Sequence, residues 1–469
     1  MSGIFKAYDV RGIYGEELTN KDAYLIGYYL AKSLNVTQFK VSHDMRLSYE
    51  NLTKCFIQGL LDAQVEVIYL GANSTPCFYY SLFEGVNSGV QISASHNSKE
   101  YNGFKFMING TSFDSRNGLE DLERIVQDDE NSKSEAFDFL EESILAESLT
   151  EFLIDREIEK INVLDNYVSY LEEFSRNVLT DKDKLNLSKL RLGFDFSNGM
   201  SSLAVSKLVE ILKLNCFLLN DSVDGSFPAH LPEPKHSEEF LKNHIAEKFD
   251  LVVSFDGDGD RLGVVDENKN FVLMDYIIAL FVDYFIHSTG SKSFVCDLRA
   301  SRVIGDIAKE KGAKVNLLRV GRSFYQDFLT KYNCKFGGEL SGHMFFKDFH
   351  NLDNPDVALI YFLKILANNV ENEKEFSFEN LIRKYKTYTK IPEKNLVVSD
   401  ADKIFELLKD KYSKNLIMEM DGLSFDFGDY WFNIRKSNTE PKVRINFEGL
   451  EEKKTVEEFK KFIEFVSKY

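Results

Sequence analysis

Short apolar runs alternate with segments of helical periodicity along most of this chain. In the first 150 residues the pattern predicts a helix over 52–64 and strands over 39–41, 65–70, 89–92 and 104–108. Strands that alternate with helices in this way are typical of βαβ units and of a parallel or mixed sheet. We therefore expect an α/β domain at the start of the chain.

The same alternation restarts twice. Near residue 160 it predicts helices over 167–178 and 201–212 and strands over 190–194, 216–219 and 251–255. Near residue 260 it predicts strands over 262–265 and 293–296 and helices over 274–287, 303–311 and 357–367. The acidic run at 127–135 and the charged stretch at 155–160 favour solvated surface at a domain boundary.

The last hundred residues follow a different pattern. It predicts helices over 401–412 and 455–468 that flank antiparallel strands over 423–427, 430–434 and 443–447, which is an α+β arrangement. The expected fold is therefore α/β with three similar βαβ-type mixed-sheet domains and a C-terminal α+β domain. We predict the domains at 1–155, 156–256, 257–370 and 371–469.

A serine-rich stretch follows the apolar run that ends at Ile92. It contains Ser95 and His96, then an Asn102-Gly103 pair where we expect a turn, and then Lys105. A serine hydroxyl at the end of a strand, with an imidazole beside it and a lysine ten residues on, can accept and return a phosphoryl group. The alternative is a polar hairpin loop in which Ser and Asn only cap the turn.

Three carboxylates at every second position, Asp256, Asp258 and Asp260, are separated by glycines and followed by Arg261. Such carboxylates can converge on one hard divalent cation, because glycine lets the backbone fold so that the oxygens point inward. An EF-hand calcium loop would need glycine at the sixth position, where Arg261 stands, and helices rather than strands on both sides. The pattern favours magnesium and a phosphate, with a solvated acidic turn as the alternative.

Two further loops carry polar side chains. In Gly337–His343, Glu339, Ser341 and His343 alternate, so on an extended backbone they would share one face and could grip vicinal sugar hydroxyls. In Ile434–Pro441, Arg435 offers a fork that matches a phosphate. Short donors for the same anion follow it: Ser437, Asn438 and Thr439. Taken alone, each segment is equally compatible with an ordinary polar loop.

Composition narrows the choice of partners and compartment. The net charge of -18 argues against nucleic acid or an anionic membrane surface as a partner. Five scattered cysteines without a C-x-x-C pair fit a reducing cytoplasm better than disulfides or a zinc site. The sequence shows no apolar run of transmembrane length and no signal peptide at its start, so we expect a cytoplasmic protein.

Taken together, the four loops resemble those of the α-D-phosphohexomutase superfamily, in the bacterial phosphomannomutase/phosphoglucomutase group. They occur in that family's order and at similar spacing, and the opening motif Ala7–Gly12 matches as well. The resemblance implies a central cleft lined by one loop from each of four domains. It also implies a hexose-phosphate mutase for mannose and glucose phosphates, with hexose phosphates as ligands and a monomer or weak homodimer as the assembly.

The resemblance assigns roles to individual residues. Ser95 would carry a phosphoryl group and, with Asp256, Asp258 and Asp260, hold one Mg²⁺. A hexose 1,6-bisphosphate, of glucose or mannose, would form, turn around in the cleft and return a phosphoryl group to Ser95. The remaining catalytic candidates are His96, Lys105, Arg11, Arg261 and His343. The substrate-binding candidates are Tyr8, Arg299, Arg322, Glu339, Ser341, His343, Arg435, Ser437, Asn438 and Thr439.

Four positions depart from the commoner family pattern. Arg322 stands where many relatives have His, Arg299 where Lys is usual, His43 where Arg is common, and Ser98 where Pro is usual. Arg322 and Arg299 would line the cleft, so they bear on sugar preference or phosphate affinity rather than on the type of reaction.

Phosphoglucosamine mutase is the nearest alternative function. That branch typically has Gln and Gly where this chain has Leu340 and Asn438, which favours mannose or glucose phosphates. A metal-dependent glycosyltransferase has no use for the serine loop. A non-catalytic sugar-phosphate-binding or calcium-binding module would leave Ser95 and Lys105 without a role.

Overall fold

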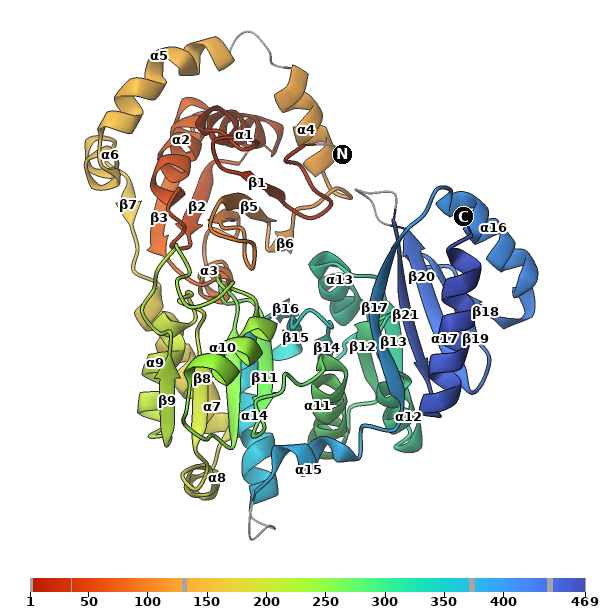
Figure 1. Ribbon diagram of the computed structural model, residues 1–469. Coiled ribbons are helices and arrows are strands. Elements are labelled where there is room, and N and C mark those ends of the chain that lie inside the picture. The colour runs from red at the N-terminus through yellow and green to blue at the C-terminus, as the bar shows by residue number, and fades with distance from the viewer. Residues whose placement is uncertain (1–2, 35, 129–132, 371–375, 437–441, 469) are drawn as a thin grey trace. The chain divides into compact units, whose positions relative to one another are not determined.

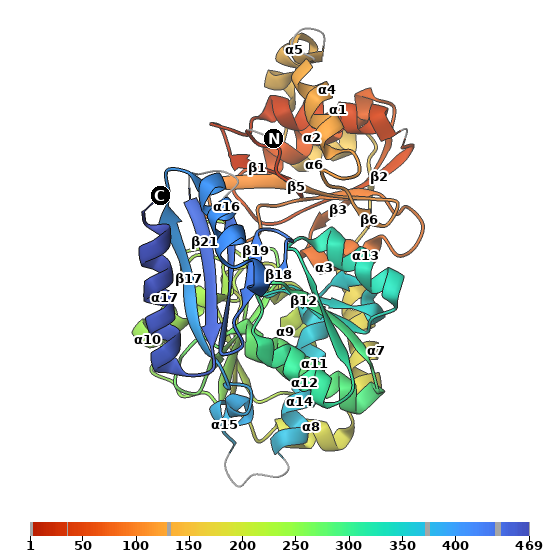
Figure 2. The same ribbon diagram turned by 90° about the vertical axis from the view of Figure 1, so that its right-hand side faces the viewer.

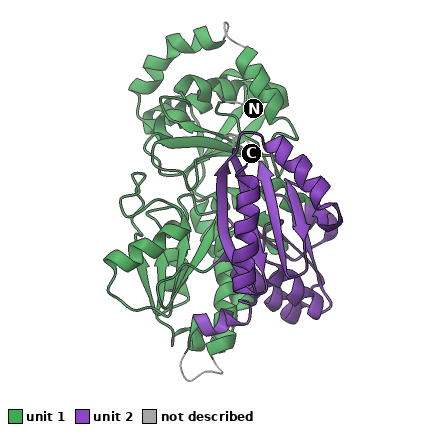
Figure 3. Ribbon diagram, turned by 45° about the vertical axis from the view of Figure 1, so that its right-hand side comes forward, with its two compact units in different colours: residues 1–272, 321–327, 341–378 green, residues 273–320, 328–340, 379–469 purple. Residues whose placement is uncertain are grey.

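The computed structural model describes residues 3–34, 36–128, 133–370, 376–436 and 442–468. The chain divides into two compact units (Figure 3). Unit 1 comprises residues 1–272, 321–327 and 341–378, and unit 2 comprises residues 273–320, 328–340 and 379–469.

The first sheet of unit 1 has seven strands in the order β1-β5-β4-β2-β3-β7, with β6 paired to β5. The strands are β1 (Val10–Ile13), β2 (Gln38–His43), β3 (Glu66–Ala72), β4 (Gly89–Ile92), β5 (Tyr101–Ile108), β6 (Thr111–Ser112) and β7 (Glu159–Lys160). β2 runs parallel to β3 and β4, whereas β5 is antiparallel to β4 and β1. This mixed sheet confirms the predicted class of the first domain.

Helices α1 (Asn20–Leu34) and α2 (Tyr49–Asp62) pack side by side, and α2 contacts β2, β3 and β4 (Figure 1). Their apolar faces join the strands in one core that includes Phe39, Phe56 and Phe104, all without exposed surface. The other helices of this part are α3 (Thr75–Ser81), α4 (Leu119–Asp128), α5 (Lys133–Ala146) and α6 (Leu149–Asp155).

The second sheet of unit 1 has the order β11-β10-β8-β9. Its strands are β8 (Leu192–Asp195), β9 (Cys216–Leu219), β10 (Leu251–Phe255) and β11 (Leu262–Asp266). The helices of this part are α7 (Leu164–Val178), α8 (Asp181–Leu187), α9 (Ser202–Ile211), α10 (Ser237–His244) and the 3₁₀ turn η1 (Pro234–His236). β8 is parallel to β9 and β10, and β10 and β11 form an antiparallel hairpin.

Unit 1 also contains a short hairpin of β15 (Met344–Phe346) and β16 (Leu352–Asp353), with the 3₁₀ turn η2 (Lys347–Phe349) between them. The apolar helix α14 (Pro355–Val370) follows and packs on α7 and α8. Among the described residues, no helix combines the length and the apolarity that crossing a bilayer would require.

Unit 2 begins with α11 (Met274–Thr289) and three parallel strands in the order β13-β12-β14. These are β12 (Ser293–Asp297), β13 (Lys314–Leu318) and β14 (Phe336–Gly338), and α12 (Arg302–Glu310) connects β12 to β13. Helix α13 (Arg322–Tyr332) crosses the division between the units at residue 328.

The C-terminal part of unit 2 is a five-stranded antiparallel sheet in the order β17-β21-β20-β19-β18. Its strands are β17 (Thr389–Val397), β18 (Leu416–Met418), β19 (Leu423–Asp426), β20 (Tyr430–Lys436) and β21 (Lys442–Gly449). Its helices are α15 (Phe378–Arg383), α16 (Ala401–Lys411), the turn η3 (Ser413–Asn415) and α17 (Glu452–Val466), which runs along the sheet (Figure 2). The predicted α+β module is confirmed.

Candidate active site

The serine loop joins β4 to β5, which pair as an antiparallel hairpin with Ile92 opposite Phe104. Ser95 is 2% exposed and has a φ of +51°, a left-handed conformation that is costly for a residue other than glycine. The Ser95 amide donates to the Ser93 hydroxyl at 2.9 Å. A strained backbone at a buried hydroxyl is a common feature of functional sites, so this loop holds Ser95 in one defined orientation.

The predicted turn at Asn102-Gly103 is wrong, because both residues lie within β5. The chain turns earlier, between Ser95 and Glu100. Gly103 is needed for another reason. A Cβ there would lie 2.2 Å from the carbonyl oxygen of Val10 on β1, so glycine allows β1 to approach the serine hairpin.

Arg46 is fully buried and binds the serine loop through four backbone carbonyls. Its Nη2 donates to the carbonyls of Ser95 at 2.8 Å and Asn97 at 2.6 Å. Its Nη1 donates to those of Ser98 at 2.6 Å and Tyr101 at 2.9 Å. Its Nε bonds the Asp44 carboxylate at 3.2 Å, which supplies the counter-charge. One guanidinium therefore defines the path of the whole loop.

The acidic loop joins β10 to β11, and Phe255 pairs with Leu262, so its six residues form a tight hairpin turn. Asp256, Asp258 and Asp260 are fully buried, and one oxygen of each lies within 4.8 Å of the others. The glycines permit a close approach: a Cβ at Gly257 would lie 2.7 Å from the Ser95 carbonyl, and one at Gly259 only 2.4 Å from Ser201 Oγ. The structure therefore brings the three carboxylates together, as predicted.

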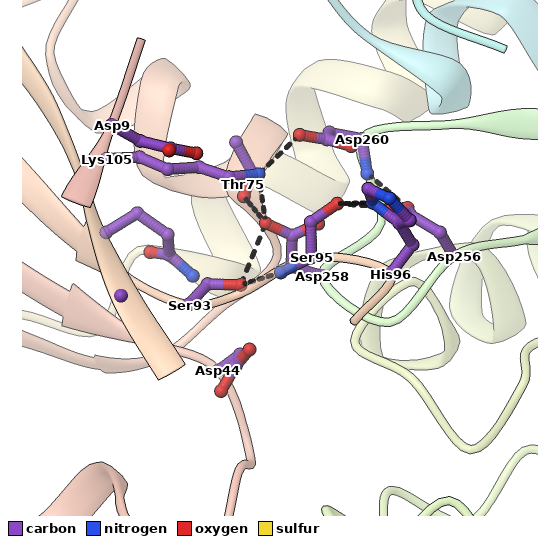
Figure 4. A network of polar contacts seen from close by, with 12 residues as sticks. Asp9, Asp44, Thr75, Ser93, Ser95, His96, Lys105, Asp256, Asp258 and Asp260 are labelled. Carbon is purple, nitrogen blue, oxygen red and sulfur yellow. Dashed lines mark hydrogen bonds and ion pairs between the residues drawn. The ribbon is translucent and has the colours of Figure 1, made fainter. Parts of the chain in front are cut away.

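The two loops meet directly (Figure 4). Ser95 Oγ donates to Asp256 Oδ2 at 2.7 Å. Lys105 on β5 is 4% exposed, and its Nζ donates to Asp258 Oδ2 at 2.5 Å and to Asp260 Oδ2 at 2.6 Å. A serine hydroxyl, a buried cation and three carboxylates thus share one buried site, where charge interactions are strong.

The hydrogen bonds of the carboxylates leave particular oxygens uncovered. Asp258 Oδ2 accepts from Lys105, from Thr75 Oγ1 at 2.7 Å and from Ser93 Oγ at 3.0 Å. Asp258 Oδ1 and Asp260 Oδ1 are buried and have no hydrogen-bond partner among the described residues. Buried oxygens without hydrogen bonds are costly, and three converging carboxylates, two of them with such an oxygen, match the hard oxygen ligands of a divalent cation. The residues present therefore fit a metal ion.

The charges around the three carboxylates shift their pKa values in opposite directions. Burial, together with repulsion from Asp260 and Asp258, raises the pKa of Asp256 well above its usual value. Burial also opposes ionisation of Asp260, but Lys105 and nearby His343, Arg322 and Arg261 outweigh it and hold that pKa well below the usual value. Of the three carboxylates, Asp256 is therefore the one that holds a proton most strongly.

The other predicted catalytic residues of unit 1 surround this centre. Arg11 pairs with Asp9, and its Nη1 donates to Asn97 Oδ1 at 2.7 Å. Arg261 Nε lies 3.8 Å from Asp256 Oδ2. His96 Nδ1 is 3.4 Å from Ser95 Oγ, and burial with the adjacent Arg261 and Arg11 lowers the pKa of His96 to about 2. His96 is therefore neutral at physiological pH and is suited to orienting the serine.

His343 belongs to a second cluster beside Asp260. Its Nδ1 donates to Asp353 Oδ2 at 2.8 Å and to the Asp260 carbonyl at 3.1 Å, which leaves Nε2 as the nitrogen that can exchange a proton. Burial lowers its affinity for a proton, but Asp260 and Asp353 outweigh this effect and raise the pKa of His343. Arg322 lies 3.3 Å from both Asp260 Oδ2 and Asp353 Oδ1. Asp260, His343 and Asp353 could also group around a cation, but Arg322 already neutralises that position.

The expectation that Glu339, Ser341 and His343 share one face of an extended backbone is wrong. The chain turns at Leu340 and Ser341, and Gly342 has a φ of +98°. Gly342 packs against β11, where a Cβ would lie 2.8 Å from the Leu262 carbonyl. In unit 1, Ser341 is half-buried in this turn, and Tyr8 is 40% exposed beside Phe324.

The remaining predicted residues belong to unit 2. Glu339 is 3% exposed just after β14. Arg299 donates from Nε to Asp297 Oδ1 at 2.8 Å. Arg435 on β20 donates to Glu393 at 3.1 Å. Ser437, Asn438 and Thr439 lie outside the described residues.

Four residues of these sites were missed by the sequence analysis: Arg46, Thr75, Asp353 and Glu393. Arg46 and Asp44 follow the buried strand β2, and a charged pair at the end of a buried strand is a usable signal. Thr75, Asp353 and Glu393 carry no local pattern that separates them from ordinary polar residues.

Comparisons with known proteins cover nearly the whole chain. Four family models, described as phosphoglucomutase/phosphomannomutase alpha/beta/alpha domains I, II and III and C-terminal domain, match residues 2–133, 165–269, 274–388 and 393–464. A phosphomannomutase of Methanocaldococcus jannaschii is 33% identical over 98% of this chain and 97% of its own length. A phosphomannomutase/phosphoglucomutase of Pseudomonas aeruginosa is 29% identical over 96% of this chain and 92% of its own length.

Two solved structures extend the comparison. A phosphoglucomutase/phosphomannomutase family protein of Burkholderia thailandensis superposes with a TM-score of 0.80 at 25% identity, over 99% of this chain and 97% of its own. An Aspergillus fumigatus N-acetylphosphoglucosamine mutase in complex with glucose 1,6-bisphosphate has a TM-score of 0.55 at 15% identity, over 97% of this chain and 93% of its own, and shows the same fold.

Proposed function

Because the chain belongs to the phosphoglucomutase/phosphomannomutase family, we propose that it interconverts mannose 1-phosphate and mannose 6-phosphate, and the corresponding glucose phosphates. Ser95 carries the phosphoryl group, and a hexose 1,6-bisphosphate is the intermediate. The observation that carries this proposal is the hydrogen bond from Ser95 Oγ to Asp256, one of three buried carboxylates that lie together, with Lys105 bonded to the other two.

In the forward half-reaction, the bond between phosphorus and Ser95 Oγ breaks and a bond from phosphorus to the free sugar hydroxyl forms. The serine oxygen leaves with the electron pair of the broken bond and takes up a proton through Asp256, its hydrogen-bond partner at 2.7 Å. His343 Nε2 takes the proton of that hydroxyl, and Asp353 holds the ring in place through Nδ1. Lys105 and Arg261 neutralise the charge on the group in transfer. The return step reverses these roles after the bisphosphate has turned around.

Asp256, Asp258, Asp260 and the phosphorylated Ser95 hold Mg²⁺ in this proposal. The ion supplies charge neutralisation to the phosphoryl oxygens when it is bound. The proposal is supported by Asp258 Oδ1 and Asp260 Oδ1, two buried carboxylate oxygens that accept no hydrogen bond from the described residues.

The sugar and the non-reacting phosphate need groups that tolerate both orientations of the substrate. We assign the sugar hydroxyls to Glu339 and Ser341, and the phosphate to Arg435 with Ser437, Asn438 and Thr439. Tyr8, Arg299 and Arg322 complete the substrate-binding set. The domain boundaries at 155/156, 256/257 and 370/371, the cytoplasmic location, the monomer or weak homodimer, and the absence of nucleic-acid and membrane partners stay predictions.

The proposal is tested by turnover of mannose 1-phosphate with Mg²⁺ and a trace of glucose 1,6-bisphosphate, with glucose 1-phosphate and glucosamine 1-phosphate assayed in parallel. We expect conversion of mannose and glucose phosphates and loss of activity when the metal is chelated. Turnover of glucosamine 1-phosphate alone would keep the mechanism and overturn the interpretation of Leu340 and Asn438. No turnover of any of the three substrates by phosphorylated protein would contradict the proposed function.

The role of Asp353 leads to a separate prediction. Asp353→Asn removes the charge that stabilises the protonated ring of His343 and allows the other tautomer, so kcat should fall by about 10- to 100-fold. The effect through His343 is measured as kcat at saturating mannose 1-phosphate, because Asp353 also pairs with the proposed substrate-binding residue Arg322 and KM can change as well. Asp348→Asn, in the same hairpin, is the matched control. A kcat within twofold of the wild type would show that His343 needs no partner.

A further inference from the structure

Glu393 lies at a bulge in β17, the edge strand of the C-terminal sheet. Ile391 pairs with Phe447 and Lys394 with Ile445, so Pro392 and Glu393 together face only Asn446. A β-bulge re-aims the side chains of its strand, and proline is tolerated there because an edge strand need not donate at every position. The bulge therefore directs Glu393 to a position that a regular strand would not reach.

At this position Glu393 meets two arginines of unit 2. Its Oε2 accepts from Arg435 Nη2 at 3.1 Å and from Asn446 Nδ2 at 3.1 Å, and it lies 3.9 Å from Arg299 Nη1. The side chains are partly buried, with 28% of Glu393, 14% of Arg435 and 15% of Arg299 exposed. Burial opposes ionisation of Glu393, but Arg435, Asn446 and Arg299 outweigh it and lower the pKa, so the carboxylate is charged at neutral pH.

The two arginines are not equally engaged. Arg299 uses Nε and Nη2 on Asp297, which leaves Nη1 on the side of Glu393. Arg435 Nε is buried and has no hydrogen-bond partner among the described residues. One oxygen of Glu393, Oε2, therefore lies near the guanidinium groups of both Arg435 and Arg299. The remaining N–H donors of these groups match a phosphate better than a carboxylate.

We infer that Glu393 is an internal competitor for the substrate phosphate. Its carboxylate pairs with Arg435 and faces Arg299 until a dianionic phosphate displaces it, and so it weakens phosphate affinity. This inference rests on the proposed function, in which Arg435 holds the non-reacting phosphate. A mutase must release its bisphosphate intermediate from one orientation and bind it in the other, and a competing carboxylate favours that release.

The opposite role is that of an organiser, in which Glu393 holds Arg435 in the conformation that phosphate needs. The two roles predict opposite changes in phosphate affinity when the charge of Glu393 is removed. Glu393→Gln keeps an amide oxygen that can accept from Arg435 and Asn446 but removes the negative charge. A competitor predicts tighter phosphate binding in this variant, by about three- to tenfold, whereas an organiser predicts weaker binding.

The experiment is a calorimetric titration of the full chain with inorganic phosphate. We expect a lower Kd for Glu393→Gln than for the wild type, and loss of that gain in the double variant Glu393→Gln/Arg435→Gln. Glu379→Gln is the matched control, because Glu379 pairs with Lys386 in the same unit and is similarly exposed. Thermal unfolding of each variant checks that the fold is kept.

An unchanged or raised Kd for inorganic phosphate in Glu393→Gln would overturn the inference. Phosphate binding that stays tighter than in the wild type when Arg435 is also replaced would overturn it too. The proposed function is tested by a different result. If the wild type turns over no hexose phosphate but Glu393→Gln binds inorganic phosphate more tightly through Arg435, the competitor role stands and the mutase assignment does not.

Discussion

Ser95→Ala is expected to abolish phosphoryl transfer, with a loss of about 10⁴-fold or more in kcat. Ser95 Oγ is the hydroxyl that touches Asp256 and lies beside His96. In the proposed reaction it is the atom that carries the phosphoryl group, and a methyl group there leaves nothing to phosphorylate. The lysine and the carboxylates would remain in place, so folding and substrate binding should be nearly unaffected.

The measurement combines kcat for mannose 1-phosphate with intact-mass analysis after incubation with glucose 1,6-bisphosphate. Wild-type protein should gain the mass of one phosphoryl group, and Ser95→Ala should gain none. Ser98→Ala is the matched control, since it lies in the same loop and Arg46 holds it only through its backbone carbonyl. A stable phosphoryl group on the Ser95→Ala protein, or turnover within tenfold of the wild type, would exclude Ser95 as the carrier.

The sequence was sufficient to predict the fold where local patterns and tertiary structure agree. β4, β9 and β10 have the predicted bounds because each is a short apolar run followed by polar residues. The serine and acidic motifs were found because each directly follows such a strand. Edge strands such as β13 and β17 were missed because half-exposed or exposed positions carry no continuous apolar signal.

The two wrong local predictions have a common physical cause. Asn102-Gly103 was expected to turn and does not, while Leu340–Gly342 was expected to be extended and turns. In both places a glycine permits close backbone packing, against Val10 on β1 and against Leu262 on β11. Whether the glycine lies in a turn or in an extended strand depends on which distant segment packs against it. The local sequence does not identify that segment.

The contacts of Arg46 in the active site could not be predicted from the local sequence either. Its four carbonyl acceptors are 49 to 55 residues away in the sequence, and backbone carbonyls have no residue-specific signature. The local sequence shows an Asp44–Arg46 pair after a buried strand, which marks a candidate site but does not indicate which carbonyls the arginine binds. The fold buries that pair fully and places Phe227 over the guanidinium, with 5.1 Å from Cζ to the ring centroid.

The position of Arg46 predicts that its shape matters as much as its charge. Lysine keeps the positive charge beside Asp44, but its single ammonium cannot reach four carbonyls and the carboxylate in the planar arrangement that a guanidinium provides. The loop from Ser95 to Tyr101 would then relax, and Ser95 would no longer be held at a φ of +51°. A displacement of about 1 Å at a reacting atom is enough to cost about 100-fold in rate.

We therefore expect Arg46→Lys to lower kcat for mannose 1-phosphate by about 100-fold. KM should change by less than about threefold, because Arg46 touches only the loop and not the proposed substrate groups. Arg46→Met, which leaves Asp44 buried without its partner, should in addition lower the free energy of unfolding by about 3–5 kcal/mol. Arg156→Lys, at a partly buried arginine that lies over Phe152, is the control for a general loss of packing. If Arg46→Lys loses stability in proportion to activity, or if both Arg46→Lys and Arg156→Lys keep kcat, the loop does not depend on Arg46 for its catalytic geometry.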